Sequence, residues 1–314
     1  MNTRIPIIYD TDLGEDIDDL YALYFALCHP ALDVIAVTTA HGDTVRKSRL
    51  ARKVLRMAGR EDIPVGTGIG LSEARRQRGQ HWPDSNVAAS FLDYVTPEDP
   101  EFSMVFPEAQ EVLTTAISTA TAPVALVGEG AFSNLAQLLL SANTTLRQRI
   151  GCIAIMGGEN DRVMNEWNVH CDPEAADVLF NSGVPLFMGT FEVTAQLIMT
   201  MTEVEYEFSA RPESLYCALN DCTRLWWRKQ GGRVGPVLYD LVPLFWLIDP
   251  DCVKTRPAHI RVELEGTYTR GQTVRVSGVG DGDTLESLSL NANAMVRDFV
   301  ATIHTFVQNT HASI

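Results

Sequence analysis

The chain has 314 residues, and its 40 acidic and 25 basic side chains give it a formal net charge of −15. Such an acidic surface excludes a nucleic-acid partner, because proteins hold the phosphate backbone mainly with clustered lysine and arginine. Hydrophobic residues make up 46% of the chain, and its 22 glycines and 15 prolines are an ordinary content, which excludes a disordered or fibrous protein.

The N-terminal segment reaches an acidic residue at Asp10 before an apolar stretch of signal-peptide length can develop. No later stretch approaches the roughly 18 uninterrupted apolar residues of a membrane-spanning helix. We therefore expect a cytoplasmic protein with no membrane partner.

Short β-branched, nearly continuous apolar runs predict buried strands at residues 5–9, 32–39, 124–127, 153–156 and 184–188. Segments with a helical period lie between them, at residues 20–27, 47–58, 109–118, 133–140 and 173–180. Strands that alternate with helices form right-handed crossovers. The sequence therefore predicts an α/β fold with an open, mainly parallel, Rossmann-like sheet that is flanked by helices.

Two regions depart from this alternation. Residues 72–98 are rich in polar side chains and include His81 and Trp82, and we expect a long loop there, of the kind that is often functional. From about residue 201 the pattern predicts helices at 215–227 and 241–248, a hairpin-like pair around 263–276 and a last helix at 293–308. No glycine- or serine-rich linker precedes this part, so we expect one domain, 1–314, with a helical and short β C-terminal elaboration.

An acidic cluster follows the first predicted strand. Six carboxylates occur within ten residues, namely Asp10, Asp12, Glu15, Asp16, Asp18 and Asp19. Acids at a helix start can act as caps, which would account for Asp16 or Asp18. Repulsion among all six needs a cation or protons to offset it. Because carboxylate oxygens suit calcium or magnesium, not zinc, the cluster predicts a metal site.

Two other known motifs contain closely spaced acids. An EF-hand loop lies between two helices, whereas this segment follows a strand, so that interpretation is poor. A phosphohydrolase of the haloacid dehalogenase type also has Asp-x-Asp after its first strand. Asp10 would be its nucleophile, and we keep this interpretation as an alternative.

Further motifs, in order along the chain, carry a more specific resemblance. Asp-Thr-Asp-x-Gly, followed by Asp-Asp, resembles the signature of the inosine-uridine preferring nucleoside hydrolase family. Other segments similar to that family's motifs are Gly130-Ala131-Phe132-Ser133-Asn134, Met156-Gly157-Gly158, Glu166-Trp167-Asn168, Asp172-Pro173-Glu174-Ala175-Ala176, Tyr239-Asp240 and the segment 265–271. The matches extend from residue 5 to about residue 275.

The resemblance implies a site in which a calcium ion and a nucleoside are bound together. It implies that the calcium ligands are Asp12, Asp19, the carbonyl of Ser133 and Asp240. It also implies that Asp18, Glu166 and Asn168 bind ribose hydroxyls, that Met156 and Asn160 line the sugar pocket, and that Asp43 stands where the family has an asparagine near the ribose.

The activity implied by the resemblance is calcium-dependent hydrolysis of the N-glycosidic bond of a nucleoside to free base and ribose, as in purine or pyrimidine salvage. A metal-bound water would be the nucleophile and Asp12 its general base. Neighbouring carboxylates would favour the oxocarbenium-like charge on the ribosyl ring. The resemblance also implies a homodimer or homotetramer.

Tyr239 stands where the family commonly has a histidine, so the group that activates the leaving base stays open. Tyr239 could donate a hydrogen bond to the base, stack on it, or serve only in packing. Tyr239 and Asp43 together prompt a further alternative, a catalytically silent protein that binds ribose or a nucleoside. The sequence does not specify the base preference.

Overall fold

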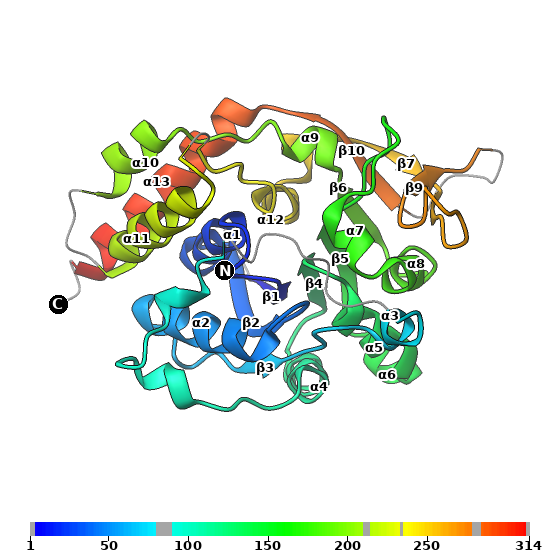
Figure 1. Cartoon of the computed structure of the whole chain (residues 1–314), viewed down its shortest axis with the longest axis horizontal. Helices are drawn as coiled ribbons and strands as arrows, with labels where there is room; N and C mark the ends of the chain where they lie inside the picture. The colour runs from blue at the N-terminus through cyan, green and yellow to red at the C-terminus, as the bar shows by residue number, and fades with distance from the viewer. Residues whose placement is uncertain (1–3, 80–89, 210–213, 233–234, 278–283, 312–314) are drawn as a thin grey trace.

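The computed structural model describes residues 4–79, 90–209, 214–232, 235–277 and 284–311. Its centre is an eight-stranded sheet in the order β3-β2-β1-β4-β5-β6-β10-β7 (Figure 1). Neighbouring strands are parallel except that β10 and β7 are antiparallel. The strands are β1 (Ile5–Thr11), β2 (Leu32–Thr39), β3 (Val65–Thr67), β4 (Val124–Glu129), β5 (Ile150–Met156), β6 (Leu186–Gly189), β7 (Val253–Ala258) and β10 (Thr284–Leu290). The predicted mainly parallel sheet is confirmed.

The helices form a layer on each face of the sheet. The helices α1 (Asp18–Cys28), α2 (Thr44–Met57), α11 (Ser214–Lys229), α12 (Leu241–Ile248) and α13 (Ala292–His311) contribute to the core on one face. The helices α4 (Ala109–Thr119), α5 (Ser133–Ser141) and α8 (Pro173–Phe180) contribute to the core on the other face. These eight are the predicted helices. Among the described residues, no helix is long and apolar enough to cross a membrane.

Five short α-helices lie on the connections of the described part of the chain: α3 (Glu73–Gln77), α6 (Thr144–Arg147), α7 (Trp167–Cys171), α9 (Phe191–Thr194) and α10 (Met201–Phe208). The predicted hairpin is an antiparallel pair formed by β8 (Ile260–Val262) and β9 (Thr273–Arg275). Its strands begin earlier and end earlier than the range that the sequence predicted.

The prediction of one long loop over residues 72–98 is wrong at both ends of that range. Residues 73–77 form α3, and the Arg75 guanidinium holds this helix by donating to the carbonyls of His170 and Cys171. A 3-10 helix, Leu92–Tyr94, lies near the other end, and Phe91 before it is fully buried. These tertiary contacts leave no local signal in the sequence. Residues 80–89, with His81 and Trp82, lie outside the described residues.

The apolar pattern of the sequence does not predict β3, β7 and β10. Strand β10 has no continuous apolar run, because its buried residues include Thr284, Glu286 and Ser287. The buried Glu286 carboxylate is not left unpaired, because Arg256 on β7 and Arg275 on β9 donate hydrogen bonds to it. Partners that are distant in the chain therefore make this strand possible, and the apolar pattern does not reveal it.

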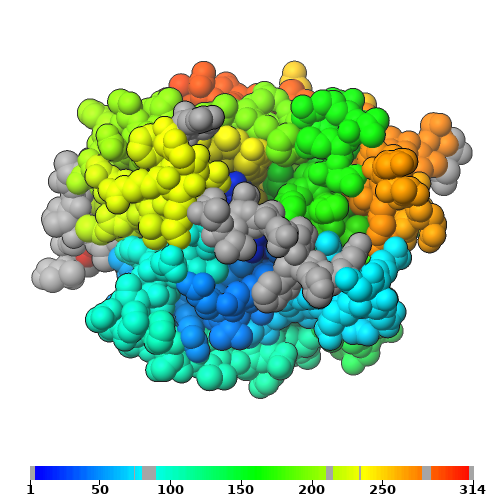
Figure 2. All heavy atoms as spheres, in the orientation of Figure 1, coloured from blue at the N-terminus to red at the C-terminus, as the bar shows by residue number. Residues whose placement is uncertain are grey.

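The direction of the chain across the sheet reverses between β1 and β4. From β1 the chain runs outward through β2 and β3, and it then returns to β4 on the other side of β1. In an open parallel sheet, the crevice outside the carboxyl ends at such a switch point is where ligands bind. A hollow opens there, and blue atoms of the N-terminal segment are visible in it between the yellow and green parts of the chain (Figure 2).

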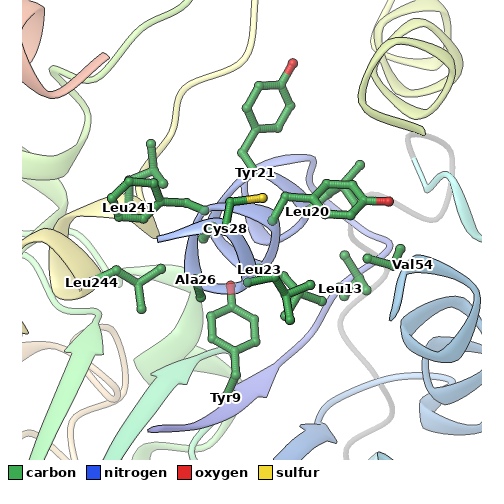
Figure 3. Packing of buried hydrophobic residues seen from close by; sticks show 14 of the residues in the cluster. Tyr9, Leu13, Leu20, Tyr21, Leu23, Ala26, Cys28, Val54, Leu241 and Leu244 are labelled. Carbon is green, nitrogen blue, oxygen red and sulfur yellow. The ribbon is translucent and has the colours of Figure 1, made fainter. Parts of the chain in front are cut away.

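Helix α1 lies over this switch point, and all its residues are buried. Tyr9 of β1 points at α1 from below, and Leu241 and Leu244 of α12 lie beside it (Figure 3). Phe299 of α13 packs its ring against that of Tyr21, with centroids 5.5 Å apart. Since three elements hold α1, its first turn has a fixed position at the crevice.

We expect Phe299→Ala to lower the free energy of unfolding by about 3–5 kcal/mol, because it leaves a cavity in a fully buried aromatic cluster. Urea unfolding at neutral pH measures the change. Leu140→Ala is the control, since Leu140 on α5 is 74% exposed and should cost little. Equal costs for the two variants would contradict the assigned packing of α13 on α1.

Candidate active site

A pocket of about 330 Å³ occupies the crevice at the carboxyl ends of β1 and β4. Its lining residues are Asp12, Glu15, Asp16, Asp18, Asp19, Glu129, Met156, Met164, Asn165, Glu166, Trp167, Asn168, Phe191, Tyr239 and Asp240. Eight of these fifteen carry a carboxyl group, and the described lining holds no lysine, arginine or histidine. The pocket is therefore an acidic cleft of a size that suits a small organic ligand.

Three carboxyl groups of the pocket converge on one point. Asp18 and Asp19 stand in the first turn of α1, and Asp240 directly precedes α12. One oxygen atom from each lies within 4.8 Å of the others, and all three side chains are buried. Burial raises the pKa of each well above its usual value, and the neighbouring carboxylates raise it further. A cation or bound protons must offset this repulsion.

The donor set fits a hard divalent cation. All three groups offer carboxylate oxygens, and the Oδ2 atom of Asp240 is buried without a hydrogen-bond partner in the described residues. Calcium and magnesium prefer such oxygen ligands, whereas zinc prefers nitrogen and sulfur. The residues present therefore fit the kind of metal that the sequence predicted.

The loop from β1 to α1 has a conformation that requires glycine. Gly14 has a φ of +113°, and a Cβ atom there would lie 2.5 Å from Cδ2 of Leu92. The Gly14 carbonyl accepts hydrogen bonds from the Phe91 N–H, at 2.9 Å, and from the Ser90 hydroxyl, at 2.8 Å. The segment at residues 90–92 thus holds the loop that carries Glu15 and Asp16.

A buried lysine enters this acidic wall from α2. The Lys47 side chain is fully buried, and its Nζ lies 2.8 Å from Oε1 of Glu15. Asp12 lines the pocket beside this pair; burial raises its pKa, while the charge of Lys47 opposes that rise. The sequence does not reveal this role of Lys47, because a helical period does not show which side chain meets a distant acid.

Asp10 lies next to the pocket without lining it. Its Oδ1 atom accepts from the Thr38 hydroxyl at 2.6 Å and from Nδ2 of Asn134 at 2.8 Å. Burial raises the pKa of Asp10 to about 7, although both hydrogen bonds act to lower it. Asp10 thus joins β1, β2 and α5, and this structural role disfavours the alternative in which it is the nucleophile of a haloacid dehalogenase-type enzyme.

Three of the predicted site residues lie outside the pocket lining. The Ser133 hydroxyl donates to Asp172, and Nδ2 of Asn160 donates to Glu286 at 2.6 Å. Asp43 caps α2 by accepting from the Arg46 N–H, and it lines a separate cleft. The other predicted residues, namely Asp12, Asp18, Asp19, Met156, Glu166, Asn168, Tyr239 and Asp240, all line the pocket.

The wall opposite α1 is formed by the segment that leads into α7. Glu166 caps this helix, and its carboxylate accepts from the backbone N–H groups of Gly158, Asn168 and Val169. The Asn168 side chain donates to the Met156 carbonyl at 3.1 Å. Backbone contacts therefore hold the two polar side chains of this wall in place.

Aromatic residues form the outer part of the pocket. Tyr239 stacks on Phe191, with centroids 5.5 Å apart and an angle of 21°. Burial raises the pKa of Tyr239, so its hydroxyl stays protonated and can donate. His41 is buried beside Cys171 and Trp167, and burial lowers its pKa to about 3. His41 is therefore neutral at physiological pH.

Five of the lining residues were not predicted as site residues from the sequence: Glu129, Met164, Asn165, Trp167 and Phe191. Glu129 could have been found from its position, because it follows the predicted strand 124–127 by two residues, at the end where ligands bind in a parallel sheet. The other four lie on connections whose paths depend on tertiary contacts, and nothing in their local pattern marks them.

Comparison with known proteins shows a family match over nearly the whole chain. The model of the family described as inosine-uridine preferring nucleoside hydrolase matches residues 7–303. The chain is 33% identical over 281 residues to the pyrimidine-specific ribonucleoside hydrolase RihA of Citrobacter koseri, covering 86% of this chain and 88% of the relative. It is 33% identical over 278 residues to the RihA of Photobacterium profundum, with the same coverage of 86% and 88%.

Solved structures resemble this fold over almost their full length. The plant nucleoside hydrolase PpNRh1 enzyme superposes with a TM-score of 0.79 at 25% identity, covering 95% of this chain and 98% of that one. An inosine-guanosine nucleoside hydrolase superposes with a TM-score of 0.83 at 21% identity, covering 96% and 99%. At that identity the second similarity shows the fold alone.

We expect Lys47→Met to lower the free energy of unfolding by about 3 kcal/mol, because it leaves the Glu15 carboxylate in a buried place without its cation. Urea unfolding measures this, together with Glu15→Gln and the double variant. Since the two groups act on each other, the double variant should cost less than the sum of the single ones. Additive costs would contradict a coupled ion pair.

The raised pKa of Asp10 predicts a dependence of stability on pH in the presence of a chelator. Between its usual pKa of 3.8 and about 7, the folded chain retains a proton that the unfolded chain has lost, so stability falls as pH rises through this window. Asp10→Asn removes this ionisation. We expect the stability of the variant relative to the wild type to rise by about 4 kcal/mol between pH 4 and pH 8. Parallel pH profiles from urea unfolding would contradict the assignment.

Proposed function

The chain belongs to the inosine-uridine preferring nucleoside hydrolase family, and we propose that it hydrolyses the N-glycosidic bond of ribonucleosides with a bound calcium ion. Membership of this family makes the protein a nucleoside hydrolase, and therefore an N-glycosyl hydrolase.

The observation that carries the proposal is the acidic pocket at the switch point of the sheet. Breaking an N-glycosidic bond leaves positive charge on the ribosyl ring, and carboxylates close to the ring favour that charge. The described lining offers eight carboxyl groups and no cationic side chain. Its chemistry therefore matches the transition state of this reaction and disfavours a phosphorylated substrate, which would need arginine or lysine partners.

For the calcium ion we propose Asp12, Asp19 and Asp240 as side-chain ligands, with the carbonyl of Ser133. The convergence of Asp19 and Asp240 within 4.8 Å supports two of them, and the contact between the Asp12 and Asp19 carboxyls supports a third. When bound, the ion would lower the pKa of a coordinated water and orient it toward the substrate.

The chain's own residues would then act on the water and the ribose. Asp12 is the proposed general base, because it lines the pocket next to the carboxyl cluster and can take a proton from the attacking water. Asp18 and Asn168, on opposite walls, are proposed to bind ribose hydroxyls. Glu166 contributes charge and holds its wall, and Met156 contributes apolar contact beneath the sugar.

Tyr239 is proposed to act on the leaving base. Its hydroxyl remains protonated in this acidic surrounding, so it can donate a hydrogen bond to a base nitrogen or oxygen. Its stacking on Phe191 fixes the ring plane. We propose pyrimidine ribonucleosides as the first substrates to examine, because the curated relatives from Citrobacter koseri and Photobacterium profundum carry that specificity in their names.

A nucleoside panel assayed for released reducing sugar tests the proposal. We expect ribose release from at least one ribonucleoside, its loss in EDTA and its return with added Ca²⁺. Asp12→Ala should lower turnover by at least about a hundredfold, because the variant lacks the proposed base. Asp33→Asn is the matched control, since Asp33 lines a cleft elsewhere on the protein and is not part of the proposed site.

Undiminished ribose release by Asp12→Ala would overturn the role of that residue. Activity that EDTA leaves intact would overturn the calcium dependence. Thermal stabilisation by ribose without turnover on any nucleoside would instead favour the alternative of a silent binder.

A further inference from the structure

Glu129 is a buried carboxyl group that the family resemblance did not assign to any role. It is the last residue of β4 and pairs in register with Thr11 of β1. Successive side chains of a strand point to opposite faces. Because Ala125 and Val127 belong to the core beneath α1 and α12, Glu129 points to the same face, toward the first turns of these two helices.

The surroundings of Glu129 are acidic on every side that the structure describes. The carboxyl group of Asp240 faces it directly, and those of Asp18 and Asp19 are close enough to raise its pKa together with burial. The Tyr9 hydroxyl, which donates to the Asp19 carbonyl at 3.2 Å, lies in the same buried layer. No lysine or arginine acts on Glu129 among these neighbours.

Neither carboxylate oxygen of Glu129 has a hydrogen-bond partner in good geometry in the described part of the chain, although the side chain is only 1% exposed. Two other buried glutamates show how the chain satisfies such a group when its role is structural. Glu286 accepts from Arg256 and Arg275, and Glu166 accepts from three backbone N–H groups. Glu129 has no arginine partner and no such set of N–H donors. Its hydrogen-bonding neighbours are the Asp240 carboxyl and the backbone of Met156, and it lines the pocket.

An unpaired carboxylate with this burial is costly unless a proton or a cationic ligand neutralises it. The ligand must enter from the pocket, since Glu129 lines that pocket and the rest of its side chain is packed in the core. It must also be cationic and compact, because it has to lie among the carboxyl groups of Asp18, Asp19 and Asp240. These requirements are those of a divalent metal ion with hard oxygen ligands.

We propose that Glu129 is an additional ligand of the divalent cation, and that it binds the ion from the sheet side while the aspartates bind it from the helix ends. This inference rests on the proposed function, because it assumes the same cation site. A further carboxylate ligand raises the negative charge of the site and the number of protein oxygens around the ion. Both changes favour Ca²⁺, which takes more ligands than Mg²⁺ and accepts them more flexibly.

Calcium titration by calorimetry of the full chain, first freed of metal, tests the proposal. We expect Glu129→Gln to weaken Ca²⁺ binding by at least about tenfold, because affinity follows the charge and number of the ligands. Glu129→Asp keeps the charge with a shorter reach, and its Kd should lie between those of the wild type and the Gln variant. Glu111→Gln is the matched control, since it removes the same charge from an exposed position on α4 and should bind as the wild type does.

Terbium luminescence adds a readout that a structural role would not change. Tb³⁺ can replace Ca²⁺, and its decay times in H₂O and D₂O report the coordinated water molecules. We expect Glu129→Gln to hold an additional water on Tb³⁺, because a water takes the place of the missing carboxylate. In chelator, the same variant should unfold at a temperature no lower than that of the wild type, since it loses an unpaired buried charge.

The outcomes separate this inference from the proposed function. If the wild type binds no Ca²⁺, both the proposed cation site and the role of Glu129 as its ligand are overturned. If the wild type binds Ca²⁺ and Glu129→Gln binds it equally well or more tightly, Glu129 is not a ligand while the proposed function stands. A variant that is less stable in chelator, with an unchanged Tb³⁺ water count, would show that Glu129 has a structural role.

Discussion

The mutual repulsion of buried carboxyl groups at the ends of β1 and β4 is the constraint on which the rest of the structure depends. Eight carboxyl groups line one pocket of about 330 Å³, six of them are buried, and those of Asp18, Asp19 and Asp240 come within 4.8 Å of one another. Burial and like charge both disfavour their ionised forms. These carboxyl groups can therefore stay together in the folded chain only with bound protons or a cation. The same repulsion supports our proposal that the pocket binds a metal ion and a ribosyl ring that gains positive charge.

Rigid supports hold these groups together against their repulsion. Helix α1 is buried along its whole length, so the first turn that carries Asp18 and Asp19 cannot move outward. The hydroxyl groups of Thr11 and Tyr9 hold Asp19 from the strand below. Lys47 supplies a buried positive charge to the loop at Glu15. The core packing of α1 against α12 and α13 is therefore part of the site, although its residues contact no ligand.

Much of the fold could be predicted because its central strands are covered on both faces and consist of continuous apolar runs. This holds for β1, β2, β4, β5 and β6, which the apolar pattern predicted within a few residues. The apolar pattern does not predict β10, whose buried Glu286 accepts hydrogen bonds from arginines of β7 and β9. The sequence pattern does not predict α3 either, because Arg75 holds that short helix by donating to carbonyls about a hundred residues later in the chain. The local periodicity of a sequence does not indicate such distant partners.

The sequence by itself determined the alternating α/β order, the acidic cluster after β1 and the family resemblance, because each of these depends on residues that are close together in the chain. Only the tertiary structure decided which acids meet. It brought Asp240 and Glu129 to the first turn of α1, it tied Asp10 to Thr38 and Asn134, and it left Asp43 as a helix cap outside the pocket. The physical reason is that the site lies where the sheet reverses its strand order, so its members come from elements that are far apart in sequence and adjacent only after folding.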